Sequence, residues 1–316
     1  MRPMFAKRLL VLFICLTIGF TSRAQNASRI YVEPDGWGIG LNFGMSDLWG
    51  DVGTKSPITH YTNGHYFDKM AFLGGLFGRY SVHPCFGVRM QLNYGALYAS
   101  DNWNKNAAGS APFQGSDAYQ RLARAQTAKD YIFEGTFLME WLPFRSNPES
   151  RRANKKGQPF IGLGLSIFHF NQMSQAGSDG PWVNTYNLHL EGQGWGNGYP
   201  KQYSQWQPAI PIAIGYKWDI GQHLNLGVEY MYRYTFTDYL DGVSGKYVGY
   251  AAFKEHLSPH DAALAQSVAD KEASSGLGPT NAAGNLRGNP SNKDAYSTLT
   301  ITFYYKIQTR TGRWFH

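Results

Sequence analysis

Apolar and polar side chains alternate one by one in segments that recur along nearly the whole chain. In Leu224 to Tyr234, one parity holds only Leu, Val and Tyr, while the other holds Asn, Gly, Glu, Met and Arg. Successive side chains of a β-strand point to opposite faces, so this pattern predicts a strand with one apolar face and one polar face. Seven other segments share the pattern: 36–44, 71–82, 86–100, 130–142, a segment around 161–167, 206–220 and 296–308. Eight strands is an even number, as expected of a single-chain outer-membrane barrel.

The composition favours a barrel in a membrane over a soluble sandwich. Aromatic residues make up 16% of the chain and glycine occurs 36 times, and no apolar run is long enough for a transmembrane helix. The polar faces of the segments are rich in glycine, whereas the outer face of a soluble sheet would be charged. We therefore predict an all-β fold, an eight-stranded antiparallel up-and-down transmembrane β-barrel with long extracellular loops. Side chains fill the interior of a barrel of this size, which argues against porin activity.

Residues 1–24 have the features of a cleaved secretory signal peptide. Basic residues precede the apolar stretch Leu9 to Phe20, which is too short to span a membrane and ends in small residues before Gln25. We expect residues 25–316 to form the barrel domain, integral to the cell outer membrane. Four of the 29 basic residues and none of the 22 acidic residues lie in the signal segment. Most of the formal charge of +7 is therefore lost with it, and we expect no nucleic-acid partner.

The lengths of the connections predict the orientation of the barrel. Connections after the first, third, fifth and seventh strands are long, whereas those after the second and sixth are short. Outer-membrane barrels place long loops outside the cell and short turns in the periplasm. Residues 143–159, after the fourth strand, are longer than a tight turn and depart from this rule. In the longest loop, Ser258-Pro259 followed by DAALAQSVADKEA predicts a helix with a serine N-cap.

Charged side chains lie on the polar parity of several segments and would point into the barrel. Both signs are present, so we predict that they form ion pairs that brace the wall, because an unpaired buried charge is costly. These residues are Arg79, Arg89, Glu134, Glu140, Lys217, Glu229 and Arg233.

Two acidic residues flank a tyrosine where the seventh strand leaves the membrane, in the motif Asp238, Tyr239 and Asp241. The acids could bind a cation or fix a loop against the rim. Acids and an aromatic residue are also ordinary in turns and at membrane interfaces, and calcium needs several oxygen ligands. The structural interpretation is favoured, and we expect no metal or other cofactor.

The connection after the fourth strand is basic. Arg145, Arg151, Arg152, Lys155 and Lys156 stand there against a single acid, Glu149. An acidic surface of a periplasmic protein could dock on these residues, and complementary charge would speed its association. A solvated loop that touches anionic lipid headgroups is an equally good interpretation.

An enzymatic role rests on one pair of residues. Some small barrels deacylate lipid A with a serine and a histidine on the lipid-facing wall, and here His169 precedes Ser174 near the outer end of the fifth strand. Nucleophilic catalysis also requires hydrogen-bond contact between the two and an orienting group. The sequence offers neither, so we expect no enzymatic activity.

Several landmarks occur in one order along the chain. They are Asp47-Leu48-Trp49-Gly50-Asp51, Arg79-Tyr80, Arg89, Glu191-Gly192-Gln193-Gly194, Pro211, Gly215, Phe236 to Asp241 and Arg287-Gly288. Together they resemble the PorG-like family, the small outer-membrane barrel of the type IX secretion system of gliding and protein-secreting Gram-negative bacteria.

The resemblance implies a non-catalytic role in protein transport and gliding motility. The barrel would sit among outer-membrane lipids and would anchor or organise a periplasmic ring, built from a lipoprotein and its partner subunit. A second hypothesis is a generic small outer-membrane barrel that binds ligands or matrix through its surface loops. A lipid A deacylase is a distant third.

Overall fold

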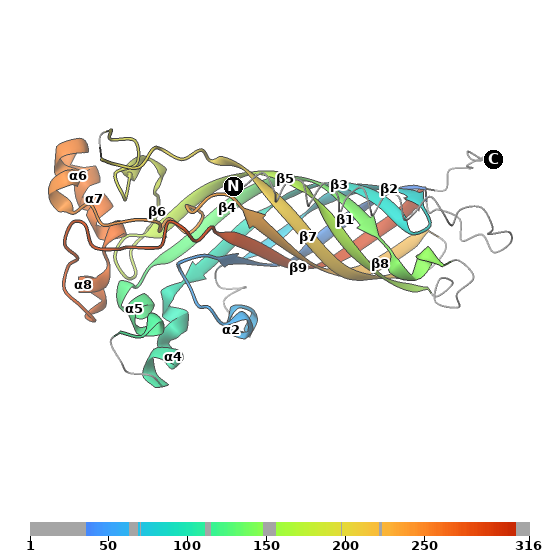
Figure 1. Ribbon diagram of the computed structural model, residues 1–316, viewed down its shortest axis with the longest axis horizontal. Helices are drawn as coiled ribbons and strands as arrows, with labels where there is room; N and C mark the ends of the chain where they lie inside the picture. The colour runs from blue at the N-terminus through green and yellow to red at the C-terminus, as the bar shows by residue number, and fades with distance from the viewer. Residues whose placement is uncertain are drawn as a thin grey trace, which may run out of the picture.

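The computed structural model describes residues 36–62, 69, 71–110, 115–147, 156–196, 198–220 and 223–307. In this part of the chain eight long strands form a tilted, closed barrel (Figure 1). They are β1 (Trp37–Trp49), β2 (Phe72–His83), β3 (Phe86–Ser100), β4 (Thr127–Trp141), β5 (Gly157–Gln175), β7 (Trp206–Asp219), β8 (Leu224–Thr235) and β9 (Ala295–Ile307). Each long strand pairs antiparallel with the next, and β1 pairs with β9, so the sheet has no free edge. The predicted fold class is confirmed.

The two faces of the wall differ as the alternation predicts. Outward side chains are apolar and strongly exposed, with Phe43, Met90 and Leu165 at 61%, 68% and 68%. Inward side chains are buried, and Leu138 and Met231 pack with Phe160 in one of the interior clusters. Closure satisfies the backbone hydrogen bonds within the sheet while the apolar face is left for lipid, which is the requirement for spanning a bilayer.

Two strands run further than their alternation suggests. β1 continues to Trp49, which pairs with Ala295, and β5 continues to Gln175, beyond the predicted segments 36–44 and 161–167. The predicted ends of these two strands were too early. Above the lipid-facing band, loops cover both faces of the strands. Hydrogen-bonded pairing therefore continues beyond the point where apolar and polar residues stop alternating.

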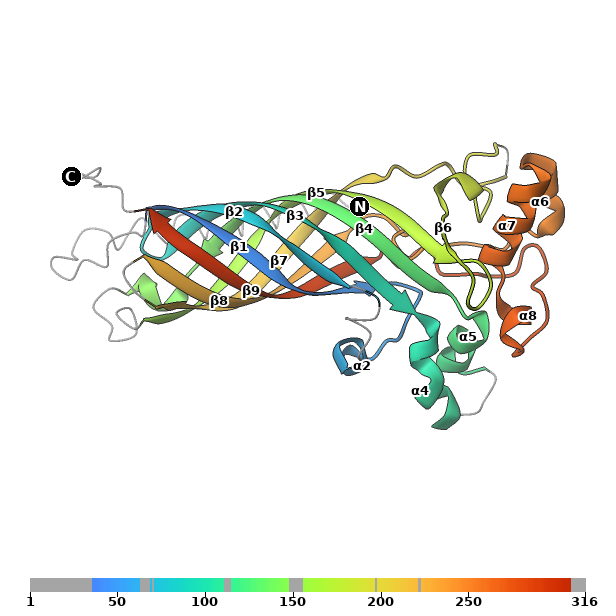
Figure 2. The same ribbon diagram turned by 180° about the vertical axis from the view of Figure 1, so that it is seen from behind.

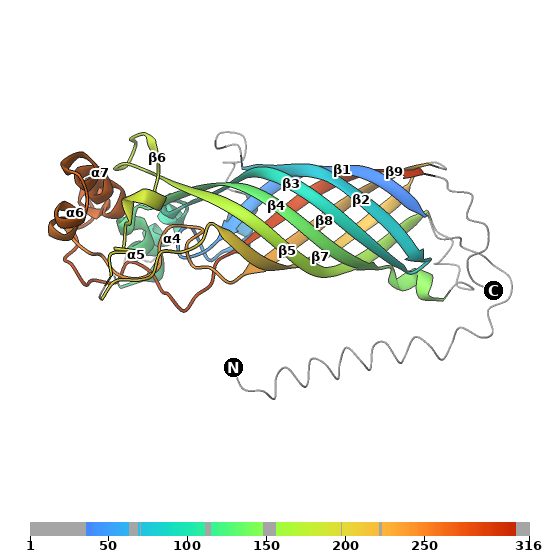
Figure 3. The ribbon, with the colours of Figure 1, turned by 90° about the horizontal axis from the view of Figure 1, so that it is seen from above.

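Helices and one short strand gather at one end of the barrel, where the long connections lie (Figures 1 and 3). We call these connections loop 1 (50–71), loop 2 (101–126), loop 3 (176–205) and loop 4 (236–294), and together the loop cap. They contain α2 (Pro57–Thr62), η1 (Asp101–Asn104), α4 (Lys105–Ser110), α5 (Asp117–Arg124), β6 (Trp182–Asn184), η3 (Tyr186–Leu188), α6 (Tyr250–His256), α7 (Pro259–Ala269) and α8 (Glu272–Ser275). Among the described residues, no helix combines the length and apolar character needed to cross a membrane.

The helix indicated in the longest loop is α7. Its N-cap is Ser258, whose Oγ accepts a hydrogen bond from the backbone N–H of Asp261 at 3.1 Å. Pro259 occupies the first helical position, where its missing N–H costs nothing. The helix packs Ala262, Ala265 and its neighbours into a small core with Phe253 of α6, so the cap has packing of its own.

The opposite end, which we call the turn end, has shorter connections. Pro84 and Cys85 form the tight turn between β2 and β3, and the link between β4 and β5 contains η2 (Pro143–Ser146). By the loop-length rule, the cap faces outside and the turn end faces the periplasm. The predicted signal peptide at 1–24 lies outside the described residues.

Candidate functional site

Four of the seven charged residues expected inside the barrel form a cluster around Glu140. Glu140 accepts hydrogen bonds from Arg79 Nε at 2.7 Å and from Lys217 Nζ at 2.5 Å. Arg89 Nε lies 3.4 Å from the other carboxylate oxygen. These residues come from β2, β3, β4 and β7, so one buried carboxylate links four strands of the wall.

Two further ion pairs cross the interior. Arg89 Nη2 donates to Glu229 Oε2 at 2.5 Å, and Arg233 donates to both oxygens of Glu134 at 3.2 and 3.1 Å. The structure thus brings together all seven residues that the alternation placed inside. Side chains occupy the lumen at these levels, which agrees with the small radius of an eight-stranded barrel.

The basic connection at the turn end differs from the prediction in one residue. Arg145 is 8% exposed and its guanidinium lies 3.6 Å from Asp219 at the end of β7, so it is not available for docking. Its place in η2 turns the side chain back against the barrel, which sequence spacing could not indicate. Lys156 is exposed. The other three residues, Arg151, Arg152 and Lys155, lie outside the described residues.

The motif after β8 lies beneath the loop cap rather than on an open rim. Asp241 is 2% exposed and accepts hydrogen bonds from the backbone N–H groups of Val52 and Val243, both at 2.8 Å. Asp238 is also buried, and Tyr239 stacks on Tyr203 with ring centroids 4.5 Å apart. The motif therefore joins loop 4 to loops 1 and 3. In the described part of the chain, no group of three or more histidine, cysteine or acidic side chains could hold a metal ion.

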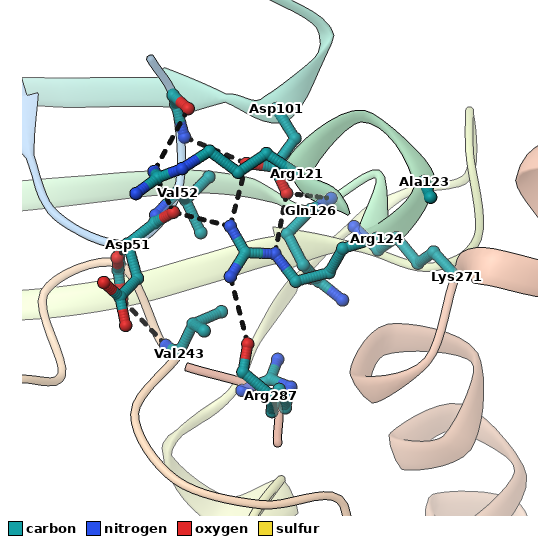
Figure 4. Close-up of polar contacts among 12 residues, drawn as sticks. Asp51, Val52, Asp101, Arg121, Ala123, Arg124, Gln126, Val243, Lys271 and Arg287 are labelled. Atoms are coloured by element: carbon teal, nitrogen blue, oxygen red, sulfur yellow. Dashed lines mark hydrogen bonds and ion pairs between the residues drawn. The ribbon is translucent and has the colours of Figure 1, made fainter. Parts of the chain in front are cut away.

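Arg124, at the end of α5, joins three loops (Figure 4). Its guanidinium donates to both oxygens of Asp101 at 2.9 Å, which fixes its orientation. The remaining donors reach the carbonyl oxygens of Asp51 in loop 1, at 2.5 Å, and of Arg287 in loop 4, at 3.0 Å. A guanidinium presents five donors in a fixed plane, which suits it to such a junction.

Arg287 continues the junction into loop 3. Its Nη1 donates to Glu191 Oε1 at 2.9 Å, and its Nε donates to the carbonyl oxygen of Ala269 at 3.2 Å. The carboxylate of Glu191 also accepts from the backbone N–H groups of Ser244 and Gly245, both at 2.8 Å. Two arginines thus connect all four loops into one body.

Burial shifts the pKa of several groups in the cap. It raises the pKa of Asp241 to about 7, assisted by the charge of Asp51, and raises that of Asp238 to about 7. Burial also lowers the pKa of Lys271 to about 7, assisted by the charge of Arg287. The Nζ atom of Lys271 lies 3.1 Å from two hydroxyl oxygens, those of Thr127 and Ser174.

A polar cavity of about 740 Å³ opens beside this junction, between α5 and the segment that follows α8. Its lining includes the three arginines Arg121, Arg124 and Arg287, together with Tyr247 and Asn281. No pattern in the sequence marked Arg124 as a central residue, because half of its hydrogen bonds go to backbone carbonyl groups and its carboxylate partner, Asp101, stands at the far end of loop 2. Glu191 and Arg287 belonged to the family landmarks, but no role was expected for them.

The two residues of the deacylase hypothesis lie on opposite faces of β5. His169 points outward and its ring lies 5.1 Å from that of Trp206. Ser174 is buried inside and donates to the carbonyl oxygen of Thr127 at 2.6 Å. The two residues are five positions apart in the strand, an odd number, so their side chains point to opposite faces. They do not form the pair that the hypothesis requires.

The closed wall, the apolar outer band and the filled interior define a small outer-membrane β-barrel protein. The chain belongs to the family described as a domain of unknown function, DUF6089, which it matches over residues 7–257.

Several solved structures of small barrels are similar to the chain at low identity. Neisserial surface protein A matches at 9% identity and a TM-score of 0.31, with 86% of this chain and 97% of that chain covered. Ail of Yersinia pestis, solved with the heparin analogue sucrose octasulfate, matches at 9% and 0.35 over 86% and 97%. OprG of Pseudomonas aeruginosa matches at 11% and 0.32 over 88% and 100%. No curated protein matches the chain significantly.

Proposed function

We propose that this barrel is a non-catalytic outer-membrane component of a type IX secretion system, which anchors or organises the periplasmic ring through protein contacts at the turn end. The observation that carries the proposal is the interior ion-pair cluster around Glu140. A barrel filled in this way offers its surfaces, rather than a passage, for function. The ordered landmarks that resemble the PorG-like family add support for the secretion role.

The composition of one turn-end connection suits a periplasmic partner. The link between β4 and β5 is the longest of the turn-end connections, and its basic residues Arg151, Arg152, Lys155 and Lys156 contrast with the other two turns. An acidic region of a ring subunit is the chemistry that complements them. Arg145 is left out of this surface because it is held by Asp219.

The test is charge reversal of these four residues to glutamate in cells that carry the ring subunits. We expect normal barrel levels in the outer membrane, loss of ring subunits from the purified barrel and reduced cargo secretion. The matched control reverses four exposed lysines of the cap, Lys105, Lys201, Lys254 and Lys293, and should leave the ring bound. Recovery of the ring with the first variant at wild-type yield would refute contact through this turn.

The cavity beside Arg124 and Arg287 favours one other function, a surface barrel that binds a polar ligand through its loops. Leu277 also lines this cavity and is 40% exposed, so a larger side chain there would narrow the opening without touching the arginine junction. Under this alternative, Leu277→Trp abolishes binding of labelled polysaccharides to whole cells, while cargo secretion is unchanged. Binding that is equal in the wild type and the variant would argue against it.

A further inference from the structure

Two lysines lie outside the barrel where it meets the loop cap, Lys129 on β4 and Lys69 in loop 1. Lys129 Nζ lies 5.1 Å from the ring centroid of Tyr131 and 5.9 Å from that of Trp182. Lys69 Nζ lies 5.8 Å from the ring centroid of Tyr98. Among the described residues, neither lysine pairs with a carboxylate. Within the described part of the chain, aromatic rings are therefore the neighbours that hold the two ammonium groups.

The register of the sheet shows that the two lysines belong to one patch. Tyr98 of β3 lies directly opposite Lys129 of β4, and the rings of Tyr98 and Trp182 are 6.1 Å apart. Trp182 comes from β6, which pairs with the end of β5. Lys69, Tyr98, Lys129, Tyr131 and Trp182 are named here the rim patch.

The rim patch lies at the level of lipid headgroups. Below Lys129, the outward side chains of β4 are Tyr131, Phe133 and Phe137, exposed by 37%, 45% and 42%. Along β4 toward the cap, the outward residues are therefore aromatic, and the next outward residue after Tyr131 is Lys129. Aromatic belts and snorkelling lysines mark the bilayer interface, and the cap begins immediately above on the same strands (Figure 2).

We propose that the rim patch binds a phosphate group of a lipid in the outer leaflet, with Lys69 and Lys129 as its cationic ligands. The aromatic rings hold the two ammonium groups at the wall through cation–π contact, and anionic headgroups attract basic residues at this depth. The patch is continuous with the apolar band along Tyr131 and Phe133, against which acyl chains can lie. This continuity favours a lipid over free phosphate.

The test compares lipid retention by the folded barrel in native mass spectrometry. The probes are lipid A with two phosphates, dephosphorylated lipid A and inorganic phosphate alone. The matched control is Lys254→Gln, because Lys254 also lies over an aromatic ring, at 4.9 Å from Tyr250, but on α6 in the cap. Heat-modifiability on gels checks that every variant is folded, and Lys129→Arg tests rescue by a retained charge.

We expect Lys69→Gln and Lys129→Gln each to weaken retention of phosphorylated lipid A by roughly fivefold, and both together by roughly 30-fold, from about 1 kcal/mol for each basic residue near a membrane surface. Lys254→Gln and Lys129→Arg should bind as the wild type does. Equal retention by the double variant would overturn the proposal, as would equal retention of dephosphorylated lipid. Lysine-dependent binding of inorganic phosphate with no preference for the lipid would assign the patch to a free anion instead.

Discussion

Arg89 on β3 donates a 2.5 Å hydrogen bond to Glu229 on β8, on the opposite side of the eight-stranded ring. Both side chains are 2% exposed, so the pair crosses the interior with little access to water. This relationship makes the interior a structural element that holds distant strands together.

Removal of one partner of this pair should destabilise the barrel more than removal of both. We expect Glu229→Gln to cost about 3 kcal/mol, because Arg89 loses its closest carboxylate and keeps only the 3.4 Å contact with Glu140, which Arg79 and Lys217 already share. The double variant Arg89→Met with Glu229→Gln should unfold closer to the wild type. Urea titrations of barrel refolded into vesicles measure the difference. Equal losses in the single and double variants would show that the pair is not the source of the cost.

Loss of Arg124 should open the loop cap without opening the barrel. Arg124→Met leaves the carboxylate of Asp101 without its bidentate partner and removes the arginine donor from the carbonyl group of Arg287 in loop 4, while Asp51 in loop 1 keeps only Arg121. We expect a loss of about 3–5 kcal/mol in cap stability, seen as faster hydrogen exchange in all four loops. Lys105→Met, at an exposed site on α4, is the control. Unchanged exchange in loop 4 would contradict the clamping role of Arg124.

Gly50 should not tolerate alanine, because loop 4 packs directly on its backbone. A methyl group there would overlap Asp241 Oδ2 and Asp294 Oδ1, the carboxylates that anchor loop 4. We expect Gly50→Ala to lower cap stability by about 1–3 kcal/mol, measured by limited proteolysis of the loops. Gly109→Ala on α4 meets no atom within 4 Å and should be neutral or slightly stabilising. Equal protease resistance of the two variants would count against tight packing at Gly50.

The cap should be least stable near neutral pH. Burial raises the pKa of Asp241 from 3.8 to about 7, so the folded cap keeps a proton that the unfolded loop loses. The stability from this group is complete below pH 3.8 and is lost as the pH rises to about 7. Lys271 affects the stability of the cap at higher pH, because burial lowers its pKa from 10.5 to about 7. Its contribution is lost as the pH falls from 10.5 to about 7.

The urea midpoint of the cap measures this dependence, followed by a fluorescent label at Lys254→Cys. The midpoint should fall between pH 5 and pH 7 in the wild type and less steeply in Asp241→Asn, in which Asp238, whose pKa burial also raises to about 7, still titrates. Asp179→Asn changes an exposed acid of loop 3 and should keep the wild-type slope. Parallel slopes in the wild type and Asp241→Asn would exclude Asp241 as the group responsible.

Alternation was sufficient to predict the barrel strands because outward side chains that face lipid must be apolar. The same parity identified the inward charges such as Arg89 and Glu140. It could not assign their partners, since parity tells which face a side chain occupies and not which strand stands across the interior. The prediction for Arg145 was wrong for another reason. Its composition-based assignment placed it in solvent, but the helical turn η2 directs its side chain back against the barrel.

Local periodicity and one local capping residue were enough to predict the number of barrel strands, their approximate limits, their inward and outward faces and the helix that follows Ser258. The loop cap and the rim patch could not be predicted in this way, because they depend on contacts between distant segments. Arg124 donates to carbonyl groups that any residue could supply as well as to Asp101, and Lys69 belongs to the same patch as Lys129 because Tyr98, beneath Lys69, pairs with Lys129 across β3 and β4. Contacts of this kind depend on closure of the barrel, which brings together residues that no pattern in the sequence connects.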